Sequence, residues 1–186
     1  IADACRDTPA LEPAGIMPEL FRNLGGKKAG RLLSLPWDLS PYYCVEMSDP
    51  SAVLLRQKFD FSASHRLHVP TLSDEENRLR FGKCNNPTGH GHNYQFEPCV
   101  ALRPASAKEA AFTLDMLERL ADETLIRRFD HKNLTTDCPE FRVGPGSSGV
   151  NATVENIATV FYDLLADAIQ KATPAAHLRS MTVWET

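Results

Sequence analysis

Residues 90–102, HGHNYQFEPCVAL, alternate along the chain in a way that an extended strand explains. Every second side chain from the start of this stretch falls on one face, and this face carries His90, His92, Tyr94 and Phe96. A period of two with aromatic residues on one face is typical of a β-strand that packs on a core. Pro98 interrupts the alternation, so we expect an edge position or a bulge at this point.

Residues 58–65, KFDFSASH, form an earlier segment with the same period. Its less polar face carries Phe59, Phe61, Ala63 and His65. Polar side chains occupy the other face, which indicates a second half-buried strand. The stretch between the two segments is LSDEENRLRFGKCNNPTGHG, residues 72–91, which we interpret as a polar linker with turns at its Asn-Asn-Pro and Gly positions.

Two later segments have the spacing of amphipathic helices. The first covers about residues 113–128, with Thr113 as the expected N-cap, and its apolar residues are Leu114, Leu117, Ala121 and Leu125. The second covers about residues 153–171, and its apolar stripe consists of Val154, Ile157, Ala158, Phe161, Leu165 and Ile169. Residues 178–185 alternate again and predict a third strand.

Strands and helices in this order predict an α+β domain with the two helices on one face of the sheet. Residues 1–50 differ from the rest because they are rich in Pro and Gly. They contain one short helix candidate near Pro18–Leu24, which Gly25 could end. We therefore expect residues 1–50 to be an N-terminal extension without an assigned role, and residues 51–186 to be the functional domain.

The composition excludes several classes of protein. Of the 186 residues, 42% are hydrophobic and 24% are charged, an ordinary balance for one domain with some extra material. The net charge of −4 gives no basic field that would bind nucleic acid. No apolar run approaches the roughly 20 residues of a membrane span, and the N-terminal residues lack the pattern of a signal peptide. Five cysteines without a C-x-x-C pair predict reduced thiols in a cytoplasmic protein.

His65, His90 and His92 are the candidates for binding a metal ion. Side chains two apart on a strand point the same way and start about 6.5–7 Å apart, so His90 and His92 can converge on one ion. His65 lies on the equivalent face of the preceding strand, where pairing could add a third nitrogen. Three neutral imidazoles with one open position are typical of catalytic zinc, whereas structural zinc uses four protein ligands. The alternative is three separate hydrogen-bonded histidines, and His68 is a weaker fourth candidate.

Other side chains could act beside such a metal. Cys84 lies in a turn, where a thiol near a metal could be a base or a nucleophile, although a buried inert cysteine is the alternative. Asp130 and His131 could form an acid–base pair, but adjacent side chains diverge, so their pairing needs a turn. Glu185 shares a strand face with apolar residues, so it is either an exposed strand end or a ligand anchor. Glu155 could serve only as a partner of the helix dipole.

These motifs resemble one family, the 6-pyruvoyltetrahydropterin synthases. The matching stretches occur in the family's order and read FSASHRL, LSDEENRLRFGKCNNPTGHGHNY, FDHKNL, ATVENIA and VWET. They cover about residues 55–186, and the CNNP-x-GHGHNY block is long and specific. The resemblance implies a zinc-dependent enzyme of pterin biosynthesis.

The resemblance also implies the roles of individual residues. The ligands of a Zn²⁺ cofactor would be His65, His90 and His92. The catalytic residues would be the proton-abstracting base Cys84 and its partners Asp130 and His131. The substrate-binding residues would be the pterin anchor Glu185 and the pocket residues Thr153 and Glu155. The implied substrate is 7,8-dihydroneopterin triphosphate, and Arg66 and Lys83 are candidates for contact with its triphosphate by charge and proximity, with solvated surface as the alternative.

The implied architecture is the tunnelling fold, in which antiparallel sheets from several subunits close into a barrel. Pterin sites then lie at subunit interfaces, so we expect a homo-oligomer, namely a hexamer of two stacked trimers. Relatives with the same zinc site make 6-carboxytetrahydropterin for deazaguanine (queuosine) biosynthesis, usually with a C-x3-H-G-H spacing. The C-x5-H-G-H spacing found here favours the 6-pyruvoyl product. Two further candidate functions are a non-catalytic pterin-binding module and a different zinc enzyme, such as a hydrolase.

The chain departs from the family's pattern in three places. Residues 1–50 have no recognised counterpart. The connection from Leu102 to Phe112 is short for the family's hairpin, and Pro98 is unexpected in its first arm. Family sequences continue into another strand beyond the position of Thr186.

Overall fold

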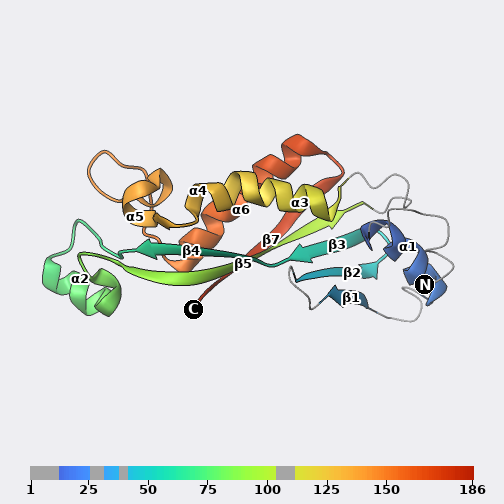
Figure 1. Cartoon of the computed structure of the whole chain (residues 1–186), viewed down its shortest axis with the longest axis horizontal. Coiled ribbons are helices and arrows are strands. Elements are labelled where there is room, and N and C mark those ends of the chain that lie inside the picture. The colour runs from blue at the N-terminus through green and yellow to red at the C-terminus, as the bar shows by residue number, and fades with distance from the viewer. Residues whose placement is uncertain (1–12, 26–31, 38–41, 104–111) are drawn as a thin grey trace.

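The computed structural model describes residues 13–25, 32–37, 42–103 and 112–186. Its helices and helical turns are α1 (Pro13–Asn23), α2 (Asp74–Phe81), η2 (Gly82–Asn85), α3 (Leu114–Ala121), η3 (Asp122–Ile126), α4 (Arg127–Phe129), α5 (Leu134–Asp137), η4 (Pro139–Phe141) and α6 (Val154–Ala172). Its strands are β1 (Leu33–Trp37), β2 (Tyr43–Asp49), β3 (Ala52–Gln57), β4 (Phe59–His65), β5 (His90–Leu102), β6 (Lys132–Asn133) and β7 (Ala176–Glu185). Figure 1 shows α3, α4 and α6 on one side of the sheet, which confirms the predicted α+β class.

Within the described residues, seven strands form one sheet in the order β1-β2-β3-β5-β4-β6, and β7 pairs with β5 outside this path. The long strands are antiparallel, as the family resemblance implied. The two-residue strand β6 is parallel to β4, which makes the sheet mixed and which the sequence did not predict. The turn before β6 holds it there, because the main-chain N–H of His131 donates to Ser62 O at 2.6 Å.

β5 is the central strand of this sheet. On one side it pairs with β4 and then with β3, and on the other side it pairs with β7. Pro98 lies between the first two, because Phe59 pairs with Phe96 and Arg56 pairs with Cys99, and the positions between them pair with β7 but with neither β3 nor β4. Since proline has no N–H to donate, this gap accommodates it. The predicted edge position is therefore wrong, whereas the predicted bulge is present as a shift in the β5–β7 register just after Cys99.

The helices predicted at residues 113–128 and 153–171 are present as the continuous run α3–η3–α4 and as α6. Thr113 and Thr153 are their N-caps, since each hydroxyl oxygen accepts the main-chain N–H three residues on. The final strand is present as β7 and starts two residues earlier than predicted.

Phe161 of α6 joins the helix layer to the sheet. Its ring centroid lies 5.3 Å from that of Phe61 on β4 and 5.4 Å from that of Phe96 on β5. The ring of Phe129 on α4 lies 5.0 Å away on the helix side. All four side chains are buried, and aromatic pairs at such separations add to the energy gained from burial. This cluster fixes the two strands that carry the three candidate metal ligands.

The helix α2 was not predicted, and our interpretation of residues 72–91 as a linker is wrong for residues 74–81. A capping box starts this helix, because Ser73 Oγ accepts the N–H of Glu76 and the Glu76 carboxylate accepts the N–H of Ser73 at 2.8 Å. Acidic residues in the first turn and basic residues in the last turn complement the helix dipole. The capping motif Ser-x-x-Glu was a usable signal, but the helix has no apolar stripe to support it.

The N-terminal segment contributes α1, β1 and β2. The helix predicted near Pro18–Leu24 is present as the longer α1, and Gly25 follows it with a φ of +91°. β1 and β2 extend the same sheet through antiparallel pairing of β2 with β3. The predicted boundary at residue 50 falls in the turn between β2 and β3. The division into extension and domain stays a prediction. Most of the connection from Leu102 to Phe112 lies outside the described residues.

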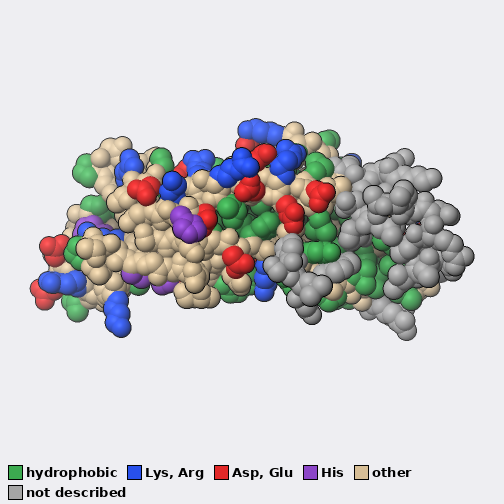
Figure 2. Space-filling model, viewed as in Figure 1, with side chains coloured by type: hydrophobic (Ala, Val, Ile, Leu, Met, Phe, Trp, Pro, Cys, Tyr) green, Lys and Arg blue, Asp and Glu red, His purple; other side chains and the backbone are tan. Residues whose placement is uncertain are grey.

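Several surface properties bear on where the protein works. None of the described helices combines the length and the apolar character that crossing a membrane requires. Figure 2 shows acidic and basic side chains interspersed over the helices of the face in view. Cys44, Cys84, Cys99 and Cys138 are free thiols, and Cys5 lies outside the described residues. The cytoplasmic localisation stays a prediction.

Phe161→Ala is expected to lower the free energy of unfolding by about 3–5 kcal/mol, because it leaves a cavity among buried rings. Denaturant-induced unfolding measures this loss. Leu79→Ala on α2 is the control, since Leu79 is 81% exposed and its truncation should change the free energy by about 0.5 kcal/mol or less. Equal losses in both variants would contradict the packing described for Phe161.

Candidate metal centre

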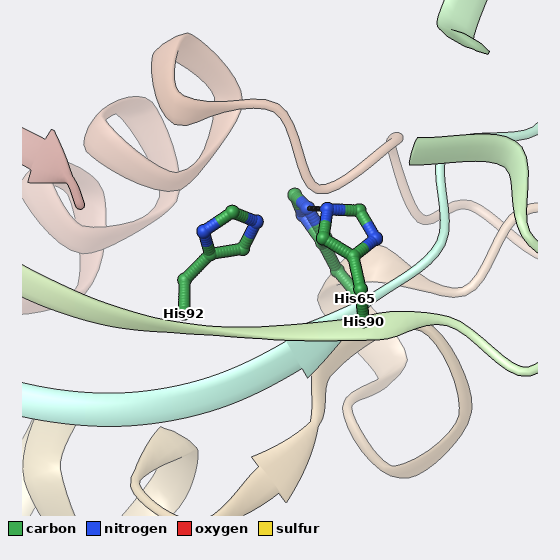
Figure 3. A group of neighbouring side chains, drawn as sticks. All are labelled: His65, His90 and His92. Carbon is green, nitrogen blue, oxygen red and sulfur yellow. Dashed lines mark hydrogen bonds between the residues drawn. The ribbon is translucent and has the colours of Figure 1, made fainter. Parts of the chain in front are cut away.

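The pairing of β4 with β5 brings the three histidines together. His65 is directly opposite His90, and Ala63 is directly opposite His92. Residues opposite each other in an antiparallel pair lie on the same face, and so do residues two apart on one strand. Figure 3 shows the three rings turned toward one another, with His65 on β4 and the other two on β5.

The distances between ring nitrogens match those of a shared ion. His65 Nε2 lies 3.3 Å from His90 Nε2, and one nitrogen of each of the three histidines lies within 4.8 Å of the others. Two nitrogen ligands of tetrahedral zinc, at about 2.0–2.1 Å each, are about 3.3–3.4 Å apart. The closest pair therefore already has the separation that zinc would impose. Among the described residues, this is the one cluster of His, Cys, Asp or Glu side chains with such geometry.

Hydrogen bonds orient two of the rings. His65 Nδ1 lies 2.7 Å from the main-chain oxygen of Ala152, and His92 Nδ1 lies 3.3 Å from the main-chain oxygen of Thr186. A main-chain oxygen can only accept, so each Nδ1 donates and each Nε2 presents a lone pair toward the cluster. Metal-binding histidines are commonly held in this way. Because Ala152 precedes the N-cap of α6, the helix layer orients the first ligand.

The environment of His65 favours a neutral imidazole, and the donor atoms of the cluster fit Zn²⁺. His65 is buried, and burial lowers its pKa, although the hydrogen bond to Ala152 and the carboxylate of Glu185 act in the opposite direction. His90 Nδ1 and His92 Nε2 are buried nitrogens without a hydrogen-bond partner among the described residues. Leaving such an atom unsatisfied is costly, and a metal ion would satisfy His92 Nε2.

Gly89 allows the chain to approach His65 closely just before β5 begins. Its φ is +71°, and a Cβ at this position would lie only 2.8 Å from the main-chain oxygen of His65. Any side chain would push the two segments apart. Since Gly89 directly precedes His90, the displacement would move a ligand. The sequence indicated only a turn here, because nothing in the sequence reports the distance to His65.

Glu185 lies beside the histidine cluster at the end of β7. Its Oε1 lies 3.2 Å from His92 Nε2 and 3.4 Å from His65 Nε2. The hydroxyl of Tyr94 donates to the same oxygen at 2.9 Å. Glu185 is not part of the group whose ligand atoms all lie within 4.8 Å, so it is a neighbour of the cluster and not a fourth member. Glu185 is exposed at the end of its strand, and its role as a ligand anchor stays a prediction.

Tyr94 is a residue that the sequence placed on the strand face without indicating a function. It is fully buried, and burial is the largest cause that raises its pKa, followed by the carboxylate of Glu185 and the thiol of Cys84. The hydroxyl therefore stays protonated and donates a hydrogen bond to Glu185. Tyr94 lies on the same face of β5 as His90 and His92, and this spacing in the sequence could have indicated that it belongs to the site.

Cys84 lies half-buried in η2, the turn before β5. Its main-chain oxygen accepts the N–H of Leu67 at 2.8 Å, which ties this turn to the segment that follows β4. The thiol is also the last of the causes that raise the pKa of Tyr94, after burial and Glu185. Cys84 is not among the three grouped metal-binding side chains, and its role as a base stays a prediction.

Asp130 and His131 form the pair that the sequence allowed if a turn were present. His131 has a φ of +56°, and its Nδ1 lies 2.8 Å from Asp130 Oδ2. The other carboxylate oxygen accepts the main-chain N–H of Ser62 at 2.8 Å. Burial raises the pKa of Asp130, but the hydrogen bonds from Ser62 and His131 outweigh it and hold the pKa below its ordinary value. The turn thus makes two adjacent side chains meet.

His131 shares a cavity with one member of the histidine cluster. His131 lines an open cavity of about 530 Å³ together with Ser62 and Asn93, whose side chains are hydrogen-bonded at 2.9 Å. Ser62 and Asn93 alternate along β4 and β5 with the residues that face the core. These two side chains of the cavity therefore lie on the sheet face away from the helices. His92 borders this cavity but Cys84 does not, and no hydrogen bond joins Cys84 to His131 among the described residues.

Thr153 and Glu155 begin α6 and serve its first turn. Thr153 is the N-cap. Glu155 is exposed, and its pKa is lowered first by a hydrogen bond from its own main-chain N–H and then by Thr153. Their contact with a pterin stays a prediction. His68 lies outside the histidine cluster, with its Nδ1 3.2 Å from Asn85 Nδ2.

The chain is similar to several known proteins. The model of the family described as 6-pyruvoyl tetrahydropterin synthase matches residues 54–186. Over 130 residues the chain is 41% identical to the 6-pyruvoyl tetrahydrobiopterin synthase of Homo sapiens, which covers 70% of this chain and 83% of that protein. The protein of the same name from Drosophila melanogaster is 40% identical over 127 residues, covering 67% and 71%. The solved 6-pyruvoyl tetrahydropterin synthase of Caenorhabditis elegans matches with a TM-score of 0.58 and 28% identity, covering 73% and 96%.

Gly89→Ala is expected to weaken Zn²⁺ binding by about tenfold or more, because the new Cβ displaces the segment that carries a ligand. Competition with a chromophoric chelator measures the affinity. Gly146→Ala is the matched control, since Gly146 has a φ of +77° but nothing within 4 Å of its Cβ position. Both variants should lose about 1–2 kcal/mol of stability from backbone strain, and only Gly89→Ala should lose zinc. Equal zinc affinities would contradict the role of the close approach.

Asp130→Asn is expected to lower the free energy of unfolding by about 1 kcal/mol at pH 7, because hydrogen bonds to a charged carboxylate are lost. The folded-state pKa of Asp130 is lowered, so its stabilisation is present above the unfolded pKa of about 3.9 and is lost as the pH falls through the folded pKa. The difference from wild type should therefore shrink between pH 5 and pH 2. Asp163→Asn, at an exposed position of α6, should show no difference at either pH. A constant difference for Asp130→Asn would refute the assignment.

Proposed function

The chain belongs to the 6-pyruvoyl tetrahydropterin synthase family and is an enzyme of that family, and we propose that it converts 7,8-dihydroneopterin triphosphate to 6-pyruvoyltetrahydropterin with loss of triphosphate. The observation that carries this proposal is the convergence of His65, His90 and His92 on one face of the sheet. All three lie inside the segment that matches the family. The C-x5-H-G-H spacing supports the 6-pyruvoyl product over the 6-carboxy product of queuosine biosynthesis.

The cofactor in this proposal is Zn²⁺, held by the three imidazoles. Two of them are oriented by main-chain oxygens, and the set leaves one coordination position open, as in catalytic zinc sites. Bound there, the ion would supply Lewis acidity that makes the C–H and O–H bonds of the substrate side chain more acidic. The histidines themselves contribute position and neutral charge, which the burial of His65 supports.

Glu185 is the proposed anchor for the pterin ring. A carboxylate can accept two parallel N–H donors, such as the amino group and a ring N–H of a pterin, and such bidentate contacts fix orientation. The hydroxyl of Tyr94 holds one carboxylate oxygen at 2.9 Å, so the group is positioned before substrate arrives. Its place beside His65 and His92 would set the ring next to the reacting side chain.

Cys84 and His131 are the proposed proton carriers. Cys84 removes the proton from the first side-chain carbon, the electron pair of this C–H bond reduces the C6=N5 bond of the ring, and a ketone forms at that carbon. Loss of the proton from the second side-chain carbon then expels triphosphate and leaves an enol, and His131, held in one tautomer by Asp130, exchanges protons in these steps. Tautomerisation of the resulting enol then gives the diketo side chain. The pairing of His131 with Asp130 at 2.8 Å supports this acid–base role.

We propose that the active form is a homo-oligomer with the tunnelling-fold barrel, a hexamer of two stacked trimers. Support comes from the lining of the cavity beside His131, which in one chain does not include Cys84. A second copy could place its own pair beside the first copy's thiol. The sheet face away from the helices carries hydrogen-bonded polar side chains, such as Ser62 with Asn93 and Gln95 with Asp60, which suits a face that lines a polar interior.

The proposal is tested by incubating zinc-loaded protein with 7,8-dihydroneopterin triphosphate and resolving the products by mass. We expect zinc-dependent release of triphosphate and a 6-pyruvoyl product. Cys84→Ala should keep its zinc and lose turnover by about 10²-fold or more, because it lacks the base. His90→Ala should lose both zinc and turnover. His68→Ala is the matched control and should keep both, since His68 lies outside the cluster.

Each other outcome has a definite meaning. A 6-carboxy product with acetaldehyde would keep the site and move the protein to deazaguanine biosynthesis. Zinc binding without any turnover, in an intact oligomer, would refute the proposed reaction and indicate a pterin-binding module. Full activity of Cys84→Ala would refute the assignment of the base.

A further inference from the structure

A second cavity, separate from the one beside His131, lies beside α2 and η2. Its volume is about 320 Å³. The side chains and main chain that line it belong to Arg66, Asp74, Arg78, Gly82, Lys83, Asn85, Asn86 and Pro87. On the face that Figure 2 shows, charged side chains of both signs gather at this end of the molecule.

The charges in this cavity are unbalanced. Arg66, Arg78 and Lys83 are basic, and Asp74 is the one acidic residue that lines it. None of the three basic side chains takes part in an ion pair with a described residue. Like charges gathered in a hollow repel one another unless an anion joins them. The cavity therefore has the charge and the size of a site for a small polyanion.

One of the three cations is held in place by the protein. Arg66 donates from Nε to the main-chain oxygen of Asn85 at 3.2 Å, which leaves its two terminal nitrogens without a partner among the described residues. A guanidinium fixed in this way presents a fork that matches two oxygens of a phosphate. Arg78 and Lys83 add two exposed charges to the same hollow.

Residues that line this cavity are direct neighbours in sequence of His65 and Cys84. Arg66 follows the metal-ligand candidate His65, so their Cα atoms are about 3.8 Å apart. Lys83 and Asn85 flank Cys84, the proposed base. The two segments are joined because Leu67 N–H donates to Cys84 O at 2.8 Å. Basic side chains, Arg66 and Lys83, are therefore neighbours in sequence of His65 and Cys84. A substrate that reacts at the histidine cluster would have these charges nearby.

We propose that this cavity binds the triphosphate of the substrate, with Arg66, Arg78 and Lys83 contacting the phosphate oxygens. The inference rests on the proposed function, since it names the subsite for the part of the substrate that leaves. A triphosphate carries several negative charges, so its affinity should fall steeply with salt. The same subsite would hold the inorganic triphosphate that the reaction releases, which makes triphosphate a product inhibitor.

The test uses inorganic tripolyphosphate as the probe and the zinc-loaded full chain as the protein. Arg78→Gln and Lys83→Gln should each weaken tripolyphosphate binding by about tenfold, as expected for loss of a charge-assisted contact. Arg80→Gln is the matched control, because Arg80 lies on the same helix, is exposed and does not line the cavity. It should change the affinity by less than about twofold. Calorimetry measures the binding, and the KM for 7,8-dihydroneopterin triphosphate should rise in parallel while zinc content stays constant.

The outcomes separate this inference from the proposed function. Equal affinities of Arg78→Gln and Arg80→Gln for tripolyphosphate would overturn the cavity assignment, and wild-type turnover would still support the function. Wild-type protein that binds tripolyphosphate through Arg78 without turning over the pterin would sink the proposed function and keep the polyphosphate site. A rise in KM for both α2 variants alike would reduce the effect to general surface charge and overturn the subsite.

Discussion

The register between β4 and β5 is the constraint on which the site depends. With His65 opposite His90, the aromatic residues and the histidines of both strands lie on one face, and the serines of β4 lie on the other. Because side chains alternate along a strand, a slip of one residue would move every histidine to the opposite face. The stacked rings of Phe61 and Tyr94, with centroids 4.8 Å apart, hold this register from within the core. The histidine cluster is thus a continuation of the core face.

The helix layer and the last strand complete what the register begins. Phe161 packs α6 against β4 and β5, and this packing places Ala152, just before α6, where its oxygen can orient His65. β7 brings Glu185 to the other side of the cluster, where Tyr94 holds it. The cluster and its neighbours therefore come from β4, β5, β7 and the segment before α6. A metal ion at the cluster would satisfy His92 Nε2, a buried nitrogen without a hydrogen-bond partner among the described residues.

The sequence predicted those parts of the fold and site that follow from periodicity. Period two gave the strands of the three histidines, and the 3.6-residue period gave α6 and the run from α3 to α4. Features set by contacts between distant segments were not predictable, such as the close approach of Gly89 to His65 and the orphaned nitrogen of His90. α2 was missed because its capping box starts a helix without an apolar stripe. For Pro98 the sequence left an edge position or a bulge open, because no local pattern shows that two strands meet end to end beside it.

The central claim is that His65, His90 and His92 bind one zinc ion, and X-ray absorption at the zinc edge of the loaded protein tests it most directly. The account predicts a first shell of imidazole nitrogens at about 2.0–2.1 Å, with outer-shell scattering from their rings and no sulfur. A sulfur shell at about 2.3 Å would contradict it, because Cys84 would then be a ligand and could not serve as the base. Protein that takes up no zinc, or holds it without imidazole scattering, would contradict the metal centre itself.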